Sequence, residues 1–221
     1  MKMSVPFSPV ELYFSCMQKP FELYFASSNT HKKTEMQRLV LPGVRIILPS
    51  EAGITSFDPV EDGDSFIQNA LIKARCLYSI VRAPVLADDS GLAVDALGGR
   101  PGIHTSRYGC EDGRRLTSRQ QYMMLLDEMK DRSSRSARFV CAAVLMLSQD
   151  RIYVVQETVE GEIAKEPLGE NGFGYDPVFI VRGTGLSASQ LSDEEKDRLC
   201  HRGRAMRRIN RLIEEVLDEE K

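Results

Sequence analysis

The chain is organised around residues 84–99, which read PVLADDSGLAVDALGG. An apolar run leads into Asp88, Asp89, Ser90 and Gly91, and this order predicts a buried strand that delivers two carboxylates into a turn. Neighbouring residues of a strand point to opposite faces, so the two aspartates should not both bind one metal ion. We therefore expect one working acid and one supporting acid. A loop of ordinary turn-forming residues would read the same way, so the interpretation depends on the rest of the chain.

Length and composition limit the class of protein. The 221 residues are enough for a full core in one large α/β domain or in two closely joined lobes. A net charge of -3 argues against a polynucleotide partner, because nucleic-acid binders need a basic surface. No stretch approaches the ~20 apolar residues of a membrane span, so no membrane partner is expected.

The cysteines and histidines restrict the location and the metal. The five cysteines are odd in number and never form a Cys-x-x-Cys pair, which favours reduced thiols and a cytoplasmic location. The three histidines stand far apart in the sequence and cannot form a cluster for a transition metal. Any metal should therefore be held by oxygen atoms, and the expected cofactor is Mg²⁺.

Residues 1–20 differ from the rest of the chain. Pro6, Pro9 and Glu11 interrupt the short apolar run, which argues against a signal peptide. We expect a loosely attached, poorly ordered extension with Met17 as an alternative start. The remaining residues, 21–221, should form a single two-lobed domain.

A strand, a polar turn and a helix follow the extension. Residues 22–27 are β-prone, residues 28–33 are polar, and residues 34–40 have helical spacing. This order presents backbone N–H groups and a helix N-terminus, which together bind anions. The glycines of a Walker A loop are missing, and an ordinary capped helix remains the alternative. Lys32 favours a phosphate ligand.

A second strand and a long amphipathic helix come next. Residues 43–49 read as a strand and residues 61–64 as an acidic turn. Apolar residues then repeat with helical period over residues 65–81, which predicts a helix packed on a sheet. Asn69 and Lys73 share one face at the border of its apolar stripe, where side chains reach either a cleft or solvent.

The middle of the chain predicts a helix followed by a β-hairpin. Residues 115–129 predict an amphipathic helix that buries Met123, Leu125, Leu126 and Met129. Two β-rich runs, residues 137–147 and 151–159, are joined by a three-residue turn and predict an antiparallel hairpin. The expected fold class is therefore α/β with parallel and antiparallel strands mixed.

Two further segments attract attention near the C-terminus. The glycine-rich loop 161–176 carries Phe173 and Tyr175 before a short strand, and its aromatic rings could close over a flat ligand or simply staple the loop. A capping box at residues 192–195 begins the last helix. The basic residues in its first turns, with His201 among them, could face either a ligand or solvent.

Five blocks of the sequence, taken together, resemble the inosine triphosphate pyrophosphatase family. The match runs in order from about Phe21 to the C-terminal helix and leaves out only the extension. Each block is weak alone, but five in register make chance similarity implausible. The blocks are Ser28-Asn29-x-x-Lys32; Glu61-x-Gly63 with Phe66-x-x-Asn69-Ala70-x-x-Lys73-Ala74-Arg75; Ala87 to Leu92; Gly172 to Pro177; and Glu195-Lys196 with His201-Arg202-Gly203.

The resemblance implies an activity and a set of site residues. It implies a mixed central sheet flanked by helices, two lobes with an active-site cleft between them, a homodimer, and Mg²⁺-dependent hydrolysis of ITP, dITP and XTP to the monophosphate and pyrophosphate. Asp89 matches the catalytic base and a metal ligand, Glu61 a second metal ligand, and Lys73 a catalytic group that positions phosphate or water. The residues that match substrate contacts are Ser27, Ser28, Asn29, Thr30, His31 and Lys32 at the triphosphate, and Ser90, Phe173, Gly174, Tyr175, Asp176, Lys196, His201 and Arg202, mostly around the base.

Departures from the family pattern and two other functions remain to be weighed. Ser28 stands where many relatives carry glycine, so its Cβ could restrict the backbone near the phosphates. A Maf-like pyrophosphatase for modified pyrimidine or methylated nucleotides would cleave the same bond with a different base pocket. A non-catalytic nucleotide sensor would keep the pocket, but it would not need the base Asp89.

Overall fold

The computed structural model describes residues 20–110 and 115–219. Residues 1–19 of the expected extension lie outside the described residues. A six-stranded sheet with the order β2-β1-β3-β4-β5-β6 runs through the molecule. The strands are β1 (Phe21–Phe25), β2 (Val44–Ile47), β3 (Val85–Val94), β4 (Ser136–Met146), β5 (Ile152–Ile163) and β6 (Phe179–Val181). The α-helices are α2 (Thr30–Leu39), α3 (Phe66–Val81), α4 (Ser118–Glu128), α5 (Asp193–Leu199) and α6 (His201–Glu219).

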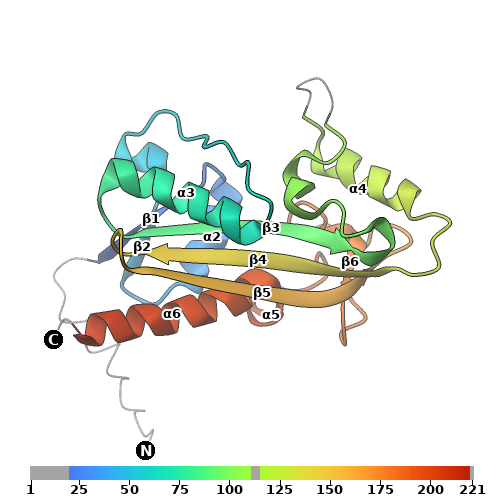
Figure 1. Cartoon of the computed structure of the whole chain (residues 1–221). Helices are drawn as coiled ribbons and strands as arrows, with labels where there is room; N and C mark the ends of the chain where they lie inside the picture. The colour runs from blue at the N-terminus through green and yellow to red at the C-terminus, as the bar shows by residue number, and fades with distance from the viewer. Residues whose placement is uncertain (1–19, 111–114, 220–221) are drawn as a thin grey trace, which may run out of the picture.

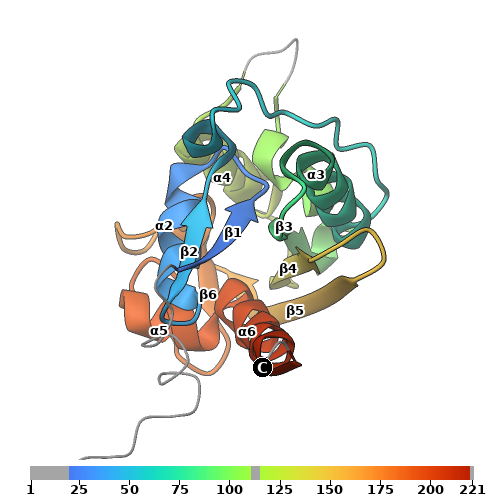
Figure 2. The same ribbon diagram turned by 90° about the vertical axis from the view of Figure 1, so that its left-hand side faces the viewer.

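The sheet confirms the predicted mixture of strand directions. Strand β1 is parallel to both β2 and β3. From β3 onward each neighbouring pair is antiparallel, and β4 and β5 form the predicted hairpin. Two helices cover the sheet on opposite faces: α3 lies on one and α6 on the other (Figures 1 and 2).

Buried side chains gather at both ends of the long strands. Helix α3 packs Ala70, Ala74 and Leu77 on one face of the sheet, and α6 packs its own apolar stripe on the other. A further cluster, which includes Leu125 and Phe179, joins α4 and β6 to the far end of β3 and β4. Figure 1 shows α3 and α4 above the same face of the sheet, near opposite ends of the strands.

The predicted turn at the two aspartates is wrong. Strand β3 continues through them to Val94, and β4 pairs with every residue along the way, including Asp88 with Ala143 and Asp89 with Ala142. Because a partner strand satisfies this backbone, Ser90 and Gly91 do not form a turn despite their turn-forming character. The aspartates therefore lie in mid-strand.

Helix boundaries also differ from the sequence interpretation. Helix α2 begins at Thr30 rather than Thr34, because the side chain of Asn29 accepts from the backbone N–H of Lys32 and caps the helix. Helix α4 begins only at Ser118, after a capping box at Thr117, and Met123 on it is 45% exposed instead of buried.

The last helix is two helices. The capping box at Ser192 starts α5 as expected, but the chain becomes extended at Cys200 and restarts as α6 at His201. The two helices approach so closely that a Cβ at Gly203 would collide with the carbonyl oxygen of Asp197. Glycine at this position therefore fixes where the first turn of α6 lies. Among the described residues, no helix is both long and apolar enough to cross a membrane.

Candidate active site

One cavity of about 620 Å³ collects most of the predicted site residues. Its wall contains every predicted catalytic, metal-binding and substrate-binding residue except Thr30 and His31, which lie in the first turn of α2 outside the lining. The sequence interpretation missed several lining residues from α2, from the segment before α3 and from the α4 side. Those with charged or amide side chains are Glu35, Asp58, Arg115 and Gln121.

The segment after β1 forms the turn that the family resemblance assigns to the triphosphate. The backbone N–H of Asn29 donates to Ser27 Oγ at 3.1 Å, and Asn29 Oδ1 in turn caps α2. The hydroxyl of Ser28 donates to the carbonyl of Phe57 at 3.0 Å. Ser28 has no positive φ, and among the non-glycine residues that the structure describes only Arg82 does. The Cβ of Ser28 therefore causes no backbone strain.

Asp89 lies on the α3 face of the sheet. Lys73 Nζ is 2.8 Å from Asp89 Oδ1 and 3.6 Å from Glu61 Oε1. Asn69 and Lys73 are both buried, so solvated side chains at these positions are excluded. Asn69 Oδ1 accepts from the backbone N–H of Gly63 at 2.9 Å, which holds the acidic turn against the helix. This arrangement brings Glu61 and Asp89 to one ammonium group.

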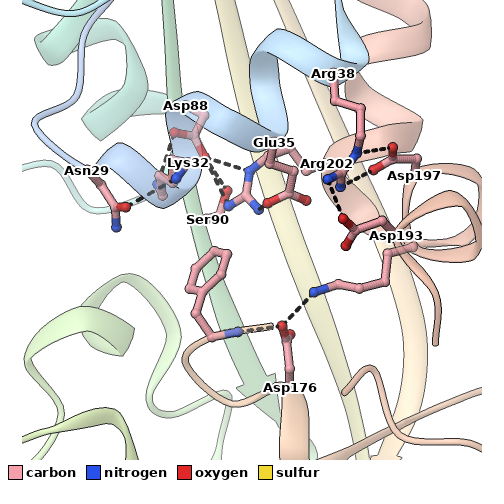
Figure 3. A network of polar contacts seen from close by, with 12 residues as sticks. Asn29, Lys32, Glu35, Arg38, Asp88, Ser90, Asp176, Asp193, Asp197 and Arg202 are labelled. Carbon is pink, nitrogen blue, oxygen red and sulfur yellow. Dashed lines mark hydrogen bonds and ion pairs between the residues drawn. The ribbon is translucent and has the colours of Figure 1, made fainter. Parts of the chain in front are cut away.

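Asp88 points the other way and has different partners. Its carboxylate is 2.9 Å and 3.0 Å from Lys32 Nζ, 3.4 Å from Arg202, and 2.7 Å from Ser90 Oγ, which donates to it (Figure 3). Asp88 is only 1% exposed. As expected from strand geometry, the two aspartates do not face one common site.

The surroundings of the two carboxylates shift their pKa values in opposite directions. Burial favours the protonated form of Asp88, but Lys32 and Arg202 outweigh it and hold its pKa well below the usual range. For Asp89, burial is the larger effect, and it raises the pKa although Lys73 acts against it. Lys73 lies near three carboxylates, which outweigh its burial and raise its pKa. Asp89 is thus the better proton acceptor of the two.

Arg202 is a buried hub between the sheet and α2. Its Nη1 is 2.7 Å from Glu35 Oε2, and its other nitrogens face Asp88. Glu35 lies one turn after Lys32 on α2, so both residues present their side chains to the same region (Figure 3). The spacing of Lys32 and Glu35 is the sequence signal that could have identified Glu35. Surface decoration is excluded for Arg202, which is 3% exposed.

The glycine-rich loop carries an aromatic ring above the cationic side chains. The backbone N–H of Phe173 and Lys196 Nζ both donate to Asp176 Oδ2, at 3.0 Å and 2.7 Å. The Phe173 ring lies 5.9 Å from Lys196 Nζ and 5.7 Å from the Arg202 guanidinium carbon. Tyr175 is buried, and its hydroxyl donates to the carbonyl of Thr105. Tyr175 therefore staples the loop, while Phe173 offers a flat face to the cavity.

Asp176 requires a glycine nearby. Gly172 has φ +81°, and a Cβ there would collide with the Asp176 carboxylate. Asp176 in turn outweighs the burial of Lys196 and raises the pKa of its ammonium. The loop is therefore closed by a charged pair that also lines the cavity.

His201 supplies an unpaired polar atom at the start of α6. Its ring stacks on Phe139 with centroids 4.9 Å apart, and its Nδ1 is buried without a hydrogen-bond partner among the described residues. Burial, with the nearby Arg202, lowers the pKa of His201 well below its usual value. His201 therefore lines the cavity as a neutral imidazole.

Acid should destabilise the fold through His201. An unfolded histidine takes up a proton near pH 6.5, whereas His201 in the folded chain takes one up only at lower pH. The contribution of His201 to stability is therefore complete above about pH 6.5 and is lost as the pH falls. We expect the free energy of unfolding, measured by urea titration, to drop by up to about 1.4 kcal/mol per pH unit in this window. His201→Gln should lose less between pH 7.5 and 5.5.

The exposed His104 provides the control for that measurement. The His104→Gln variant should follow the pH dependence of the unmodified chain. Asp89, whose raised pKa favours the folded state in acid, is present in all three proteins and cancels in the comparison. Equal losses of stability in the His201 and His104 variants would contradict the assignment.

Comparisons with known proteins agree with this geometry. The family model described as Ham1 family matches residues 23–212. The chain is 50% identical over 192 residues to a dITP/XTP pyrophosphatase of Treponema denticola, covering 87% of this chain and 98% of the relative. A dITP/XTP pyrophosphatase of Bacillus subtilis is 36% identical and is 97% covered, over 87% of this chain.

Solved structures agree as well. A structure of a HAM1 protein from Coxiella burnetii matches with a TM-score of 0.79 and 37% identity, covering 88% of this chain and 99% of that one. The Staphylococcus aureus Ham1 protein matches with a TM-score of 0.77 and 36% identity, covering 87% and 98%. A family model over most of the chain, close relatives and a shared fold lead to one conclusion: this chain belongs to the Ham1 family.

Proposed function

We propose that this chain is a nucleoside triphosphate pyrophosphatase that hydrolyses ITP, dITP and XTP to the monophosphate and pyrophosphate. The observation that supports the proposal is that one cavity is lined by two groups of side chains, one suited to hydrolysis and one suited to a flat polar ring. The first group is Asp89 with Lys73 and Glu61, and the second surrounds Phe173. The relatives named dITP/XTP pyrophosphatases support the substrate class.

The carboxylates fit Mg²⁺ that arrives with its substrate. Among the described residues, no group of three or more His, Cys, Asp or Glu side chains could hold a metal ion. Asp89 and Glu61 nevertheless lie beside one ammonium, and Mg²⁺ often binds one or two carboxylates together with substrate phosphates. We assign these two residues as its protein ligands. When bound there, Mg²⁺ would polarise phosphoryl oxygens and lower the pKa of water.

Separate side chains accept the proton, orient the water and bind the triphosphate. Asp89 takes the proton of the attacking water, because burial makes it the more basic of the two aspartates. Lys73, beside Asp89, orients that water or a phosphate oxygen, and Lys32 with the turn at Ser27–Asn29 holds the triphosphate. Positioning and electrostatics of this kind account for most of the rate in phosphoryl chemistry.

The base end of the cavity supplies selectivity. Hypoxanthine and xanthine carry a carbonyl acceptor at position 6, where adenine carries an amino donor. Donors from Arg202, Lys196 or His201 would pair with the carbonyl and face a like donor in adenine. Phe173 would stack on the ring. Buried donors that lose their partner cost free energy, so ATP should be rejected.

The remaining expectations concern assembly and location. We propose a homodimer, which rests on the family resemblance and can be measured by sedimentation. The four described cysteines are free, which supports a reducing compartment and the proposed cytoplasmic location. Of the other functions, a Maf-like pyrophosphatase and a nucleotide sensor are less well supported. The sensor does not explain why Asp89, Lys73 and Glu61 lie together.

Product analysis tests the proposed function. With Mg²⁺ present, ITP should yield IMP and pyrophosphate, separated by anion-exchange chromatography, with no accumulation of IDP. Modified pyrimidine triphosphates serve as the comparison, because a Maf-like enzyme would prefer them. IDP with orthophosphate as the main products would overturn the proposal, and binding of ITP without any turnover would favour the sensor.

A further inference from the structure

The charges of the cavity wall leave one cationic residue without an assigned role. Five cationic and five acidic side chains line the cavity. Three pairs lie within the lining: Lys73 with Asp89, Lys196 with Asp176 and Arg202 with Glu35. Lys32 is paired with Asp88, which is not part of the lining. The fifth cation, which lies just before α4, forms no ion pair with any residue that the structure describes. It is Arg115.

This balance matters because a nucleoside triphosphate carries several negative charges. Pairs of opposite charge largely cancel at a distance, so the four paired cations act on the substrate through direct contact and add little net charge to the cavity. An unpaired guanidinium can bind two phosphate oxygens at once and keeps its charge at all physiological pH values. Arg115 therefore brings to the cavity a cationic side chain that no carboxylate of the described residues pairs with.

Arg115 lies nearer to the proposed phosphate end of the cavity than to the base end. Helix α4 lies over the same face of the sheet as α3, which carries Lys73 toward Asp89 (Figure 1). Gln121 of α4 donates to the carbonyls of Ser106 and Tyr108 at 3.1 Å and 3.2 Å. Arg107, between those two residues, donates to the carbonyl of Glu61 at 3.3 Å. The start of α4 is thus tied to the metal-binding side of the cavity.

We propose that Arg115 binds the terminal phosphates of the substrate and the pyrophosphate that leaves. This inference rests on the proposed function for the identity of the substrate, and it adds a contact from the α4 side of the cavity. Arg115 then acts on every nucleoside triphosphate alike. It contributes to affinity for the phosphates and not to discrimination between bases.

Kinetics of an alanine variant test the contact. Arg115→Ala should raise the KM for ITP and the inhibition constant for pyrophosphate about tenfold each, as expected for the loss of one charge-assisted hydrogen bond. The ratio of kcat/KM for ITP to that for ATP and the melting temperature should stay the same. Arg115→Lys, which keeps the charge, should recover part of the affinity.

Arg119 provides the matched control. It is exposed, lies on α4 four residues after Arg115, and does not line the cavity. Arg119→Ala should leave both constants unchanged. Equal constants in the Arg115→Ala variant and the unmodified chain, or an equal rise in both alanine variants, would overturn the role of Arg115.

A binding measurement separates this inference from the proposed function. Calorimetric titration with magnesium pyrophosphate needs no turnover, and Arg115→Ala should bind it about tenfold more weakly than the unmodified chain. If the unmodified chain releases no pyrophosphate from ITP, the proposed function fails while this titration still tests Arg115. Equal affinity in the variant, or no measurable affinity in either protein, overturns the inference.

Discussion

Replacing Asp89 with asparagine should lower the kcat for ITP by at least about 10²-fold, because the change removes both the proton acceptor and a ligand charge for Mg²⁺. The side chain keeps its size, so the buried site beside Lys73 should stay filled. The melting temperature should therefore change little. The measurement is pyrophosphate release at saturating ITP and Mg²⁺, with thermal unfolding followed in parallel.

The neighbouring aspartate is the control for this experiment. Asp88 is fully buried and binds Lys32 and Arg202, so Asp88→Asn leaves two cations with less compensation. That variant should lose stability and affinity for ITP more than it loses kcat. A variant Asp89→Asn with near-normal kcat, or a larger loss of kcat in Asp88→Asn, would reverse the roles given to the two carboxylates.

The pH dependence of the rate should report the same residue. Asp89 must be ionised to accept a proton, and burial raises its pKa above the usual carboxylate value. Activity should therefore be lost as the pH falls through this raised pKa, at a higher pH than an exposed aspartate would give. The acid limb of kcat/KM for ITP measures it directly.

Replacing Arg202 with alanine should compress the preference for ITP over ATP. If Arg202 pairs with the carbonyl of hypoxanthine, its loss should lower kcat/KM for ITP about 10²-fold and affect ATP far less. The assay measures both substrates with the same enzyme preparation. Lys32→Ala should weaken both substrates about equally, because we place Lys32 at the phosphates.

The Arg202→Ala variant should also lose stability, because Arg202 forms buried ion pairs. Removing the guanidinium leaves Glu35 and Asp88 without their shared partner, and breaking a buried pair of this kind costs about 3–5 kcal/mol of stability. Kinetics should therefore be measured well below the melting temperature of the variant. Arg202→Lys keeps a charge but cannot reach both carboxylates in the same way. An unchanged ITP-to-ATP ratio in Arg202→Ala would remove Arg202 from base recognition.

Local pattern was enough to predict much of the fold. The helical period over residues 65–81 predicted α3, and the two β-rich runs around a short turn predicted the β4–β5 hairpin. Both elements are specified by their own residues, through the spacing of apolar side chains and the turn between strands. Resemblance over five blocks then gave the family, and these blocks lie around one cavity.

The features that the sequence did not predict depend on contacts between distant parts of the chain. Strand β3 continues past Asp89 because β4, about fifty residues later, pairs with it, and no local pattern carries that information. The break at Cys200 is enforced where Gly203 meets the backbone of Asp197. Arg115 was not identified because its place in the cavity depends on how α4 folds over the sheet.

The most direct test of the account compares ITP and ATP on the unmodified chain. Initial rates of pyrophosphate release with Mg²⁺, at substrate concentrations below KM, give the ratio of kcat/KM for the two nucleotides. The cavity predicts a preference for ITP of about 10²-fold or more, because the amino donor of adenine would face the donors that pair with the carbonyl of hypoxanthine. Equal rates for ITP and ATP, or a preference for ATP, would contradict the account.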